Sequence, residues 1–147
     1  MDLFLLLKTV HVLAAVIWVG GMFFAYVVLR PSLAALEPPQ RVALHRQVFR
    51  RFFLVVWHAM PLQLITGLWI LFAYYGGFEG VEWPIHAMFT LGVIMAAVFV
   101  MIFFGPYRRF RAAADPAVIV PTLDSIRRWI GVNLVLGLVT IVIAILG

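Results

Sequence analysis

Two histidines stand in apolar segments of this chain, where an ionisable side chain is costly and is usually kept for a function. His11 lies in an apolar segment that covers residues 9–29, and His86 lies near the start of another, residues 83–104. An imidazole in such a place can ligate copper in either oxidation state, or the iron of a b-type haem. The residue types therefore suggest metal or haem ligation at His11 and His86.

The elements that must position these histidines are helices that cross a bilayer. The chain is 65% hydrophobic and 12% charged, with a mean hydropathy of +1.10, whereas a soluble domain is nearer half apolar. A spanning helix needs about 20 mostly apolar residues. Four segments qualify, namely 9–29, 52–75, 83–104 and 129–146. We predict one transmembrane domain over residues 1–147, an all-α four-helix bundle with up-down topology.

The charges predict how this bundle is oriented. Arginines gather in the expected loops 30–51 and 105–128, whereas the middle connection carries Glu79 and Glu82 and no basic residue. Because basic loops stay in the cytoplasm, both termini are expected on the outer side of the membrane. These loops account for the net charge of +5, and we expect no nucleic-acid partner. The chain has no cysteine, which excludes thiolate ligands and disulfides.

A repeated spacing hints at two duplicated helical hairpins. Three pairs of residues lie 75 positions apart: His11 and His86, Pro31 and Pro106, and His58 and Asn133. Two parallel hairpins would be related by an axis along the membrane normal. His11 and His86 would then sit at equivalent depth near the outer face. The two halves share little overall identity, so duplication and coincidence both stay open.

Helical periodicity predicts which faces point into the bundle, because residues three and four apart share a face. Three stripes are expected to face inward: Lys8, His11, Ala15, Trp18 and Met22 on the first span; His86, Thr90, Val93 and Ala97 on the third; Asn133, Gly137, Thr140 and Ala144 on the fourth. Small and polar residues of this kind let membrane helices approach and hydrogen-bond. On the fourth span, plain helix packing is a sufficient explanation.

The remaining histidines receive more modest predictions. His58 lies about 9 Å along the second span from its start, at 1.5 Å per residue, and Asn133 lies at similar depth on the fourth. We expect a hydrogen bond between His58 and Asn133, with a second metal or haem site as the alternative. His45 stands in a basic stretch and is expected to be solvated. The methionines, such as Met22 and Met88, are expected to serve mainly in packing.

The first span carries a family resemblance. The run His11-Val-Leu-Ala-Ala-Val-Ile-Trp18-Val-Gly20-Gly21, followed by Leu29-Arg30-Pro31, resembles the first helix of the copper-resistance D (CopD) family of bacterial inner-membrane proteins. The four-helix pattern fits a minimal form of that family. The resemblance implies a bacterial inner (plasma) membrane, in which the outer side, with both termini, is the periplasmic side. Lys8-Thr9-Val10-His11 is also similar to the opening of the HemJ-type membrane proteins, which bind haem and oxidise protoporphyrinogen. The Trp-Val-Gly-Gly sequence here matches the CopD type better than the Trp-Phe-Ala-Gly of HemJ.

Three functions therefore stay open at the sequence level. A CopD-like protein would bind copper through His11 and His86 and pass it inward, with a periplasmic copper donor as partner. A b-type haem protein would use the same histidines as axial ligands, with Lys8 beside a propionate, for electron transfer to a membrane redox partner or for HemJ-like oxidation. A subunit without a ligand would use them only for hydrogen bonds. The bilayer, and a second copy of the chain, are further expected partners, and enzyme activity is expected only in the haem case.

Overall fold

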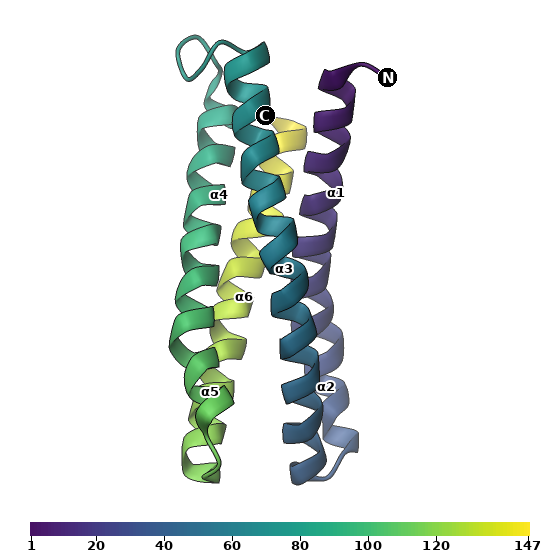
Figure 1. Ribbon diagram of the computed structural model, residues 1–147, viewed down its shortest axis with the longest axis vertical. Helices are drawn as coiled ribbons and strands as arrows, with labels where there is room; N and C mark the ends of the chain where they lie inside the picture. Colours follow the sequence, from purple (N-terminus) through teal and green to yellow (C-terminus); the bar gives the residue numbers. More distant parts are fainter.

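The computed structural model describes all 147 residues as four long antiparallel helical rods (Figure 1). The first rod comprises α1 (Leu3–Phe23), η1 (Phe24–Leu29), α2 (Arg30–Ser32) and η2 (Leu33–Ala35), and the second is α3 (Pro38–Tyr74). The third rod comprises α4 (Trp83–Ile102), η3 (Phe103–Tyr107) and α5 (Arg108–Ala112), and the fourth is α6 (Pro116–Leu146). Both termini lie at the same end as the α3–α4 connection. The prediction of an all-helical bundle with up-down topology is confirmed.

All four rods are long and apolar enough to cross a membrane. Their outward faces are rich in exposed leucine, isoleucine, valine and phenylalanine, as lipid-facing surfaces require. The segments 30–51 and 105–128, predicted as loops, are instead mostly helical. The N-termini of α3 and α6 are capped. The Glu37 amide donates to Gln40 Oε1 at 3.2 Å, and Asp115 Oδ1 accepts from the Ala117 amide at 3.0 Å. Arginine favours helix, so the arginines extend the rods once these caps begin them.

Two wide turns interrupt the odd-numbered rods. The segments η1 and η3 are π-helical, and a proline lies two residues beyond the end of the first (Pro31) and inside the second (Pro106). A proline ring clashes with the carbonyl four residues before it, so the chain must depart from α-helical geometry nearby. Such π-helical turns are frequent at functional sites. Here they lie near the arginine-rich end of the bundle (Figure 1).

The outer connection depends on glycine. Just beyond the end of α3, Gly76 has a φ of 78°, in the left-handed region, and the Gly77 amide then donates to the Leu71 carbonyl at 3.0 Å. This is the arrangement in which a left-handed glycine closes a helix and satisfies one of its last carbonyls. It turns the chain over so that α4 begins beside the end of α3.

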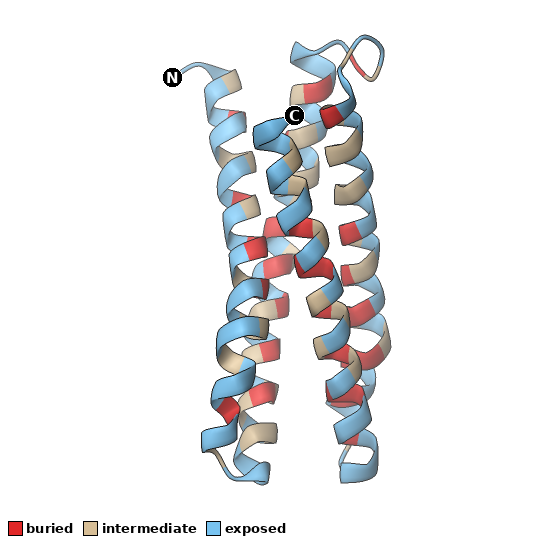
Figure 2. Cartoon of the chain, turned by 180° about the vertical axis from the view of Figure 1, so that it is seen from behind, coloured by how far each residue is buried: buried red, intermediate tan, exposed pale blue.

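The rods pack as two pairs. Helix α1 packs mainly on α3, and α4 packs mainly on α6, while α1 and α4 share no extensive contact. A single buried cluster of 18 residues runs between the rods, from Trp18 and Met60 to the aromatic group of Phe49, Phe53, Phe99 and Tyr107. Buried positions gather on the inner faces in the middle and the arginine-rich half of the bundle (Figure 2). The end with His11 and His86 contributes little to this core.

The three predicted inward stripes fare differently. On the first rod, Trp18 and Met22 are buried as predicted, although Lys8 is exposed. On the fourth, Asn133 and Gly137 are buried. On the third, the stripe prediction is wrong, because all four of its residues are exposed: His86, Thr90, Val93 and Ala97. The face of α4 that turns inward carries larger apolar side chains: Met95, Phe99 and Ile102.

Candidate functional site

His11 lies against α3, and both of its ring nitrogens are engaged there. Its Nδ1 lies 3.0 Å from the Gln63 carbonyl oxygen and 3.0 Å from Thr66 Oγ1. Its Nε2 lies 3.1 Å from Nε2 of the Gln63 side chain. The three residues His11, Gln63 and Thr66 form what we call the His11 cluster. It is the one place where a histidine of one rod is hydrogen-bonded to another rod.

The hydrogen-bond partners decide which nitrogen carries the proton. A carbonyl oxygen only accepts, so Nδ1 must donate to the Gln63 carbonyl. The Thr66 hydroxyl donates to the Leu62 carbonyl, which leaves its oxygen free to accept from the same Nδ1. Nε2 is then the unprotonated nitrogen, and its lone pair accepts from the Gln63 amide. With the Gln63 amide nitrogen directed at Nε2, these contacts fit a neutral imidazole with its lone pair at Nε2.

A glycine makes room for this imidazole. A Cβ atom placed on Gly67 would lie 2.9 Å from His11 Cε1, closer than real Cβ contacts allow. The ring thus occupies the space that a larger side chain at position 67 would fill. Beside it, Gln63 Oε1 is buried and has no hydrogen-bond partner. A buried acceptor without a partner costs free energy, so packing alone does not account for a glutamine here.

His86 is placed quite differently. Its side chain is exposed, and its ring stacks on Phe78 with 6.0 Å between ring centroids. It stands on α4, which does not pack extensively on α1. The structure therefore does not bring His11 and His86 together as two ligands on facing helices. Lys8 is exposed, one helical turn from His11 toward the N-terminus.

The predicted hydrogen bond between His58 and Asn133 is not formed. His58 is exposed, and its Nδ1 pairs with the Leu54 carbonyl of its own helix at 2.8 Å. Asn133 is buried, and its amide donates to the Met95 carbonyl at 3.1 Å. Equal depth along two spans did not place these side chains on facing surfaces, because α3 turns His58 outward.

His45 is buried rather than solvated, so that prediction is wrong. Only 5% of its surface is exposed, and its Nδ1 pairs with the Arg41 carbonyl at 3.0 Å. The basic stretch around it is not a free loop but the first turns of α3, which pack against the other rods. Met22 and Met95 are buried in the core, in line with their predicted packing role.

No three side chains among histidine, aspartate and glutamate gather closely enough to hold a metal ion between them. A ligand at His11 would therefore be held by one imidazole together with other kinds of donor. Gln63, Thr66 and Gly67 were not predicted from the sequence, although two polar side chains three residues apart in an apolar span do indicate a polar face. Their relation to His11 depends on how α1 and α3 are rotated against each other, which the spacing does not specify.

Comparison with known proteins places the chain in a family. The sequence profile of the family described as "Copper resistance protein D" matches residues 46–146. The chain belongs to this family, and it is a multi-pass membrane protein. The matched region begins in α3, so it is separate from the first-span motif on which the sequence resemblance was based.

One relative extends the comparison over nearly the whole chain. An uncharacterized protein of Aquifex aeolicus (strain VF5) is 30% identical over 146 residues, which cover 98% of this chain and 92% of that protein. That match includes α1, so the first rod is shared with a relative even though the family profile begins beyond it. No solved structure matches the chain.

Proposed function

We propose that this protein binds copper at His11 and passes it inward across a bacterial inner membrane. The observation that carries the proposal is the way in which His11 is held. Metal-ligating histidines almost always donate their second ring N–H to a carbonyl, a carboxylate or water, which fixes the tautomer and orients the ring. His11 donates Nδ1–H to the Gln63 carbonyl and so directs the Nε2 lone pair away from α3's backbone. Family membership supports copper as the metal.

The Gln63 side chain would control access to that lone pair. Its amide lies 3.1 Å from His11 Nε2, where a copper ion would have to bind. Rotation of the Gln63 side chain would uncover Nε2 and would also release the buried, unpaired Oε1. Imidazole suits both Cu(I) and Cu(II). In this proposal His86, exposed at the same end of the bundle, serves at most as a first contact for an arriving ion.

Copper is favoured over haem by the packing around α6. A macrocycle beside this helix would need small residues there, and both glycines within α6 are already covered by side chains of other rods. A Cβ on Gly131 would meet Tyr26 at 2.7 Å, and a Cβ on Gly137 would meet Val19 at 2.9 Å. These glycines accommodate protein side chains. A single ion requires no such space.

The test compares three purified proteins in detergent: wild type, His11→Ala and His86→Ala. Each is titrated with Cu(I) against a chromophoric competitor, and the absorption spectrum of the untreated protein is recorded. We expect His11→Ala to weaken Cu(I) binding at least about tenfold, as loss of a ligand or its orienting partner does, and His86→Ala to change it little. Equal affinity in wild type and His11→Ala would refute the copper proposal. A Soret band in wild type that His11→Ala abolishes would replace copper with haem.

The proposed direction rests on the charge asymmetry. The arginine-rich end would face the cytoplasm, and the end with the termini and His11 would face the periplasm. A cysteine at exposed Ser32, in the otherwise cysteine-free chain, tests this. We expect an impermeant thiol reagent to label it only after the membrane is opened. Labelling in intact spheroplasts would reverse the orientation and with it the direction of copper movement.

A further inference from the structure

A second candidate site lies at the opposite end of the bundle from His11. An open cavity of about 620 Å³ is bounded by η1 and α2 on one side and by α3 and α6 on the other. Its lining includes four basic residues and one aromatic residue: Arg30, Arg41, His45, Arg127 and Tyr26. We call it the arginine cavity. The proposed copper site uses none of these residues.

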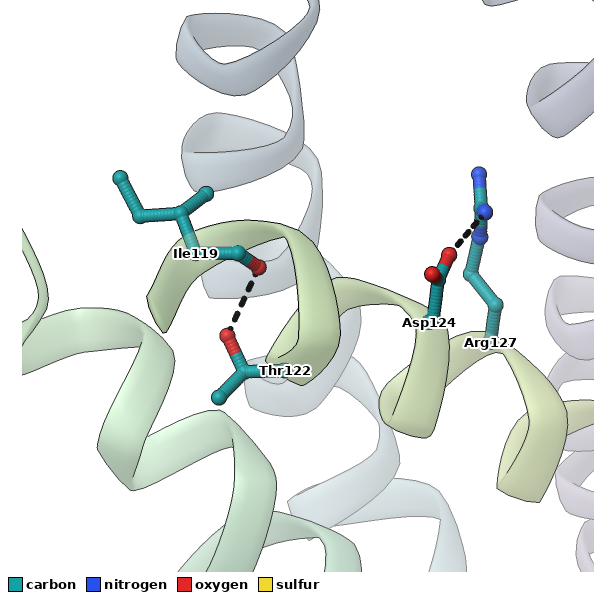
Figure 3. A network of polar contacts seen from close by, with 4 residues as sticks. All are labelled: Ile119, Thr122, Asp124 and Arg127. Atoms are coloured by element: carbon teal, nitrogen blue, oxygen red, sulfur yellow. Dashed lines mark hydrogen bonds and ion pairs between the residues drawn. The ribbon is translucent and has the colours of Figure 1, made fainter. Parts of the chain in front are cut away.

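The cavity carries uncompensated positive charge. Its three guanidinium groups come from three different rods, and one carboxylate pairs with them: Asp124, which forms an ion pair with Arg127 (Figure 3). Asp124 is largely exposed and is not part of the lining. The Nε of Arg127 is buried and has no hydrogen-bond partner. Because arginine is always charged, these groups favour an anion in the cavity.

The walls of the cavity hold their arginines in place. Arg41 donates to the Leu36 carbonyl at 2.7 Å and to the Ala34 carbonyl at 3.4 Å, which fixes its guanidinium beside the end of the first rod. The guanidinium of Arg30 lies over the Tyr26 ring, 5.3 Å from its centroid. These interactions leave both groups charged, and they position the groups before any ligand arrives.

Tyr26 is itself positioned by the fold. It belongs to the π-helical segment η1, and its ring packs so closely on α6 that a Cβ on Gly131 would lie 2.7 Å from its Cε2. The glycine and the wide turn together let Tyr26 form the inner wall of the cavity. The π-helical segment η1 therefore contributes to the cavity, because it carries Tyr26.

Other arginines at this end have structural roles. Arg46 donates to the carbonyls of Phe110 at 3.2 Å and Ala113 at 2.8 Å, and its guanidinium lies 4.7 Å from the centroid of the Phe110 ring. Its donors are used to tie α3 to the α5–α6 connection. In the cavity, by contrast, Arg127 keeps a buried Nε–H that has no partner.

We propose that the arginine cavity binds the phosphate group of an anion. Guanidinium groups match phosphate oxygens in geometry and form charge-assisted hydrogen bonds with them. Basic pockets between membrane helices at this kind of position bind lipid head groups. The phosphate can come from the head group of an anionic phospholipid at the rim of the bilayer or from free inorganic phosphate, since the same contacts serve both.

The test uses purified protein in a neutral detergent and isothermal titration calorimetry. Three ligands are titrated separately: short-chain phosphatidylglycerol below its micelle concentration, short-chain phosphatidylcholine, and inorganic phosphate. We expect saturable binding of phosphatidylglycerol or phosphate and none of phosphatidylcholine. Saturation by phosphatidylglycerol alone identifies a lipid site, whereas saturation by phosphate, with competition between the two, identifies a soluble anion.

Variants matched in charge decide whether the cavity is responsible. Arg30→Gln/Arg127→Gln removes two cavity arginines, and Arg50→Gln/Arg128→Gln removes two exposed arginines that do not line the cavity. We expect the first to weaken binding at least about tenfold and the second less than about twofold. Equal losses, or no saturable binding of either anion by wild type, would overturn the proposal. If circular dichroism shows that the first variant does not fold, the single variant Arg30→Gln, at an exposed position, is compared with Arg50→Gln instead.

Discussion

The two helix pairs, α1–α3 and α4–α6, each carry a histidine at the same end of the bundle, but the surroundings of the two histidines differ. In α1–α3, Gly67 leaves room for the His11 ring, which makes its hydrogen bonds to α3. In α4–α6, Gly137 leaves room for two apolar side chains, Met95 of α4 and Val19 of α1. His86 is left exposed on the outer side of its pair.

The difference shows what a repeated spacing can and cannot specify. The 75-residue offset places His11 and His86 near the same end of their helices. It does not fix the rotation of each helix about its axis, which depends on the side chains that interlock with the partner helix. On α4 these are Met95, Phe99 and Ile102, and they turn His86 outward. The polar site thus belongs to one pair, not to both.

The largest expected effect comes from closing the space that holds His11. Gly67→Ala should lower the free energy of unfolding by about 1–3 kcal/mol relative to Gly92→Ala, because its Cβ would overlap the His11 ring. Nothing lies within 4 Å of a Cβ at Gly92, so Gly92→Ala is the matched control for the change in helix propensity. Chemical unfolding in detergent, followed by circular dichroism, measures both.

The double variant His11→Ala/Gly67→Ala makes this test specific. Once the ring is removed, the extra methyl group at position 67 should cost little, since contacting residues couple in a double-mutant cycle. If Gly67→Ala lowers the free energy of unfolding as much in the His11→Ala background as in wild type, Gly67 does not serve to make room for the His11 ring. The cost of the substitution would then come from the α3 backbone rather than from the His11 cluster.

A smaller effect is expected from removing each histidine in turn. His11→Ala loses hydrogen bonds between helices, which in membranes contribute about 0.6 kcal/mol each on average, so a loss of about 1 kcal/mol is expected. His86→Ala removes an exposed ring and should stay within about 0.5 kcal/mol of wild type. The same unfolding measurement applies. An equal loss in the free energy of unfolding for the two variants would mean that His86 makes interactions as strong as those of His11.

Most of the fold could be predicted from composition and spacing, because four long apolar segments leave a membrane protein few alternatives. Glu37 and Asp115 cap α3 and α6 within the segments predicted as loops, and neither cap was predicted from the sequence. His11 was identified as the central residue, but its partners Gln63 and Thr66 were not. Helix rotation is decided by contacts between distant residues, and the same cause explains the errors at His58 and His86.

The smallest effect is expected at Asn133, the one buried polar side chain that joins α4 and α6 by a side-chain hydrogen bond. Its amide donates to the Met95 carbonyl, which favours folding, but its Oδ1 is buried without a partner, which opposes it. Asn133→Leu keeps the shape and removes both effects, so the free energy of unfolding should change by less than about 1 kcal/mol. Asn133→Ala, which leaves a void, should cost more. A loss above about 2 kcal/mol for Asn133→Leu would show that Oδ1 does have a partner in the folded protein, and α4–α6 would then hold a polar site of its own.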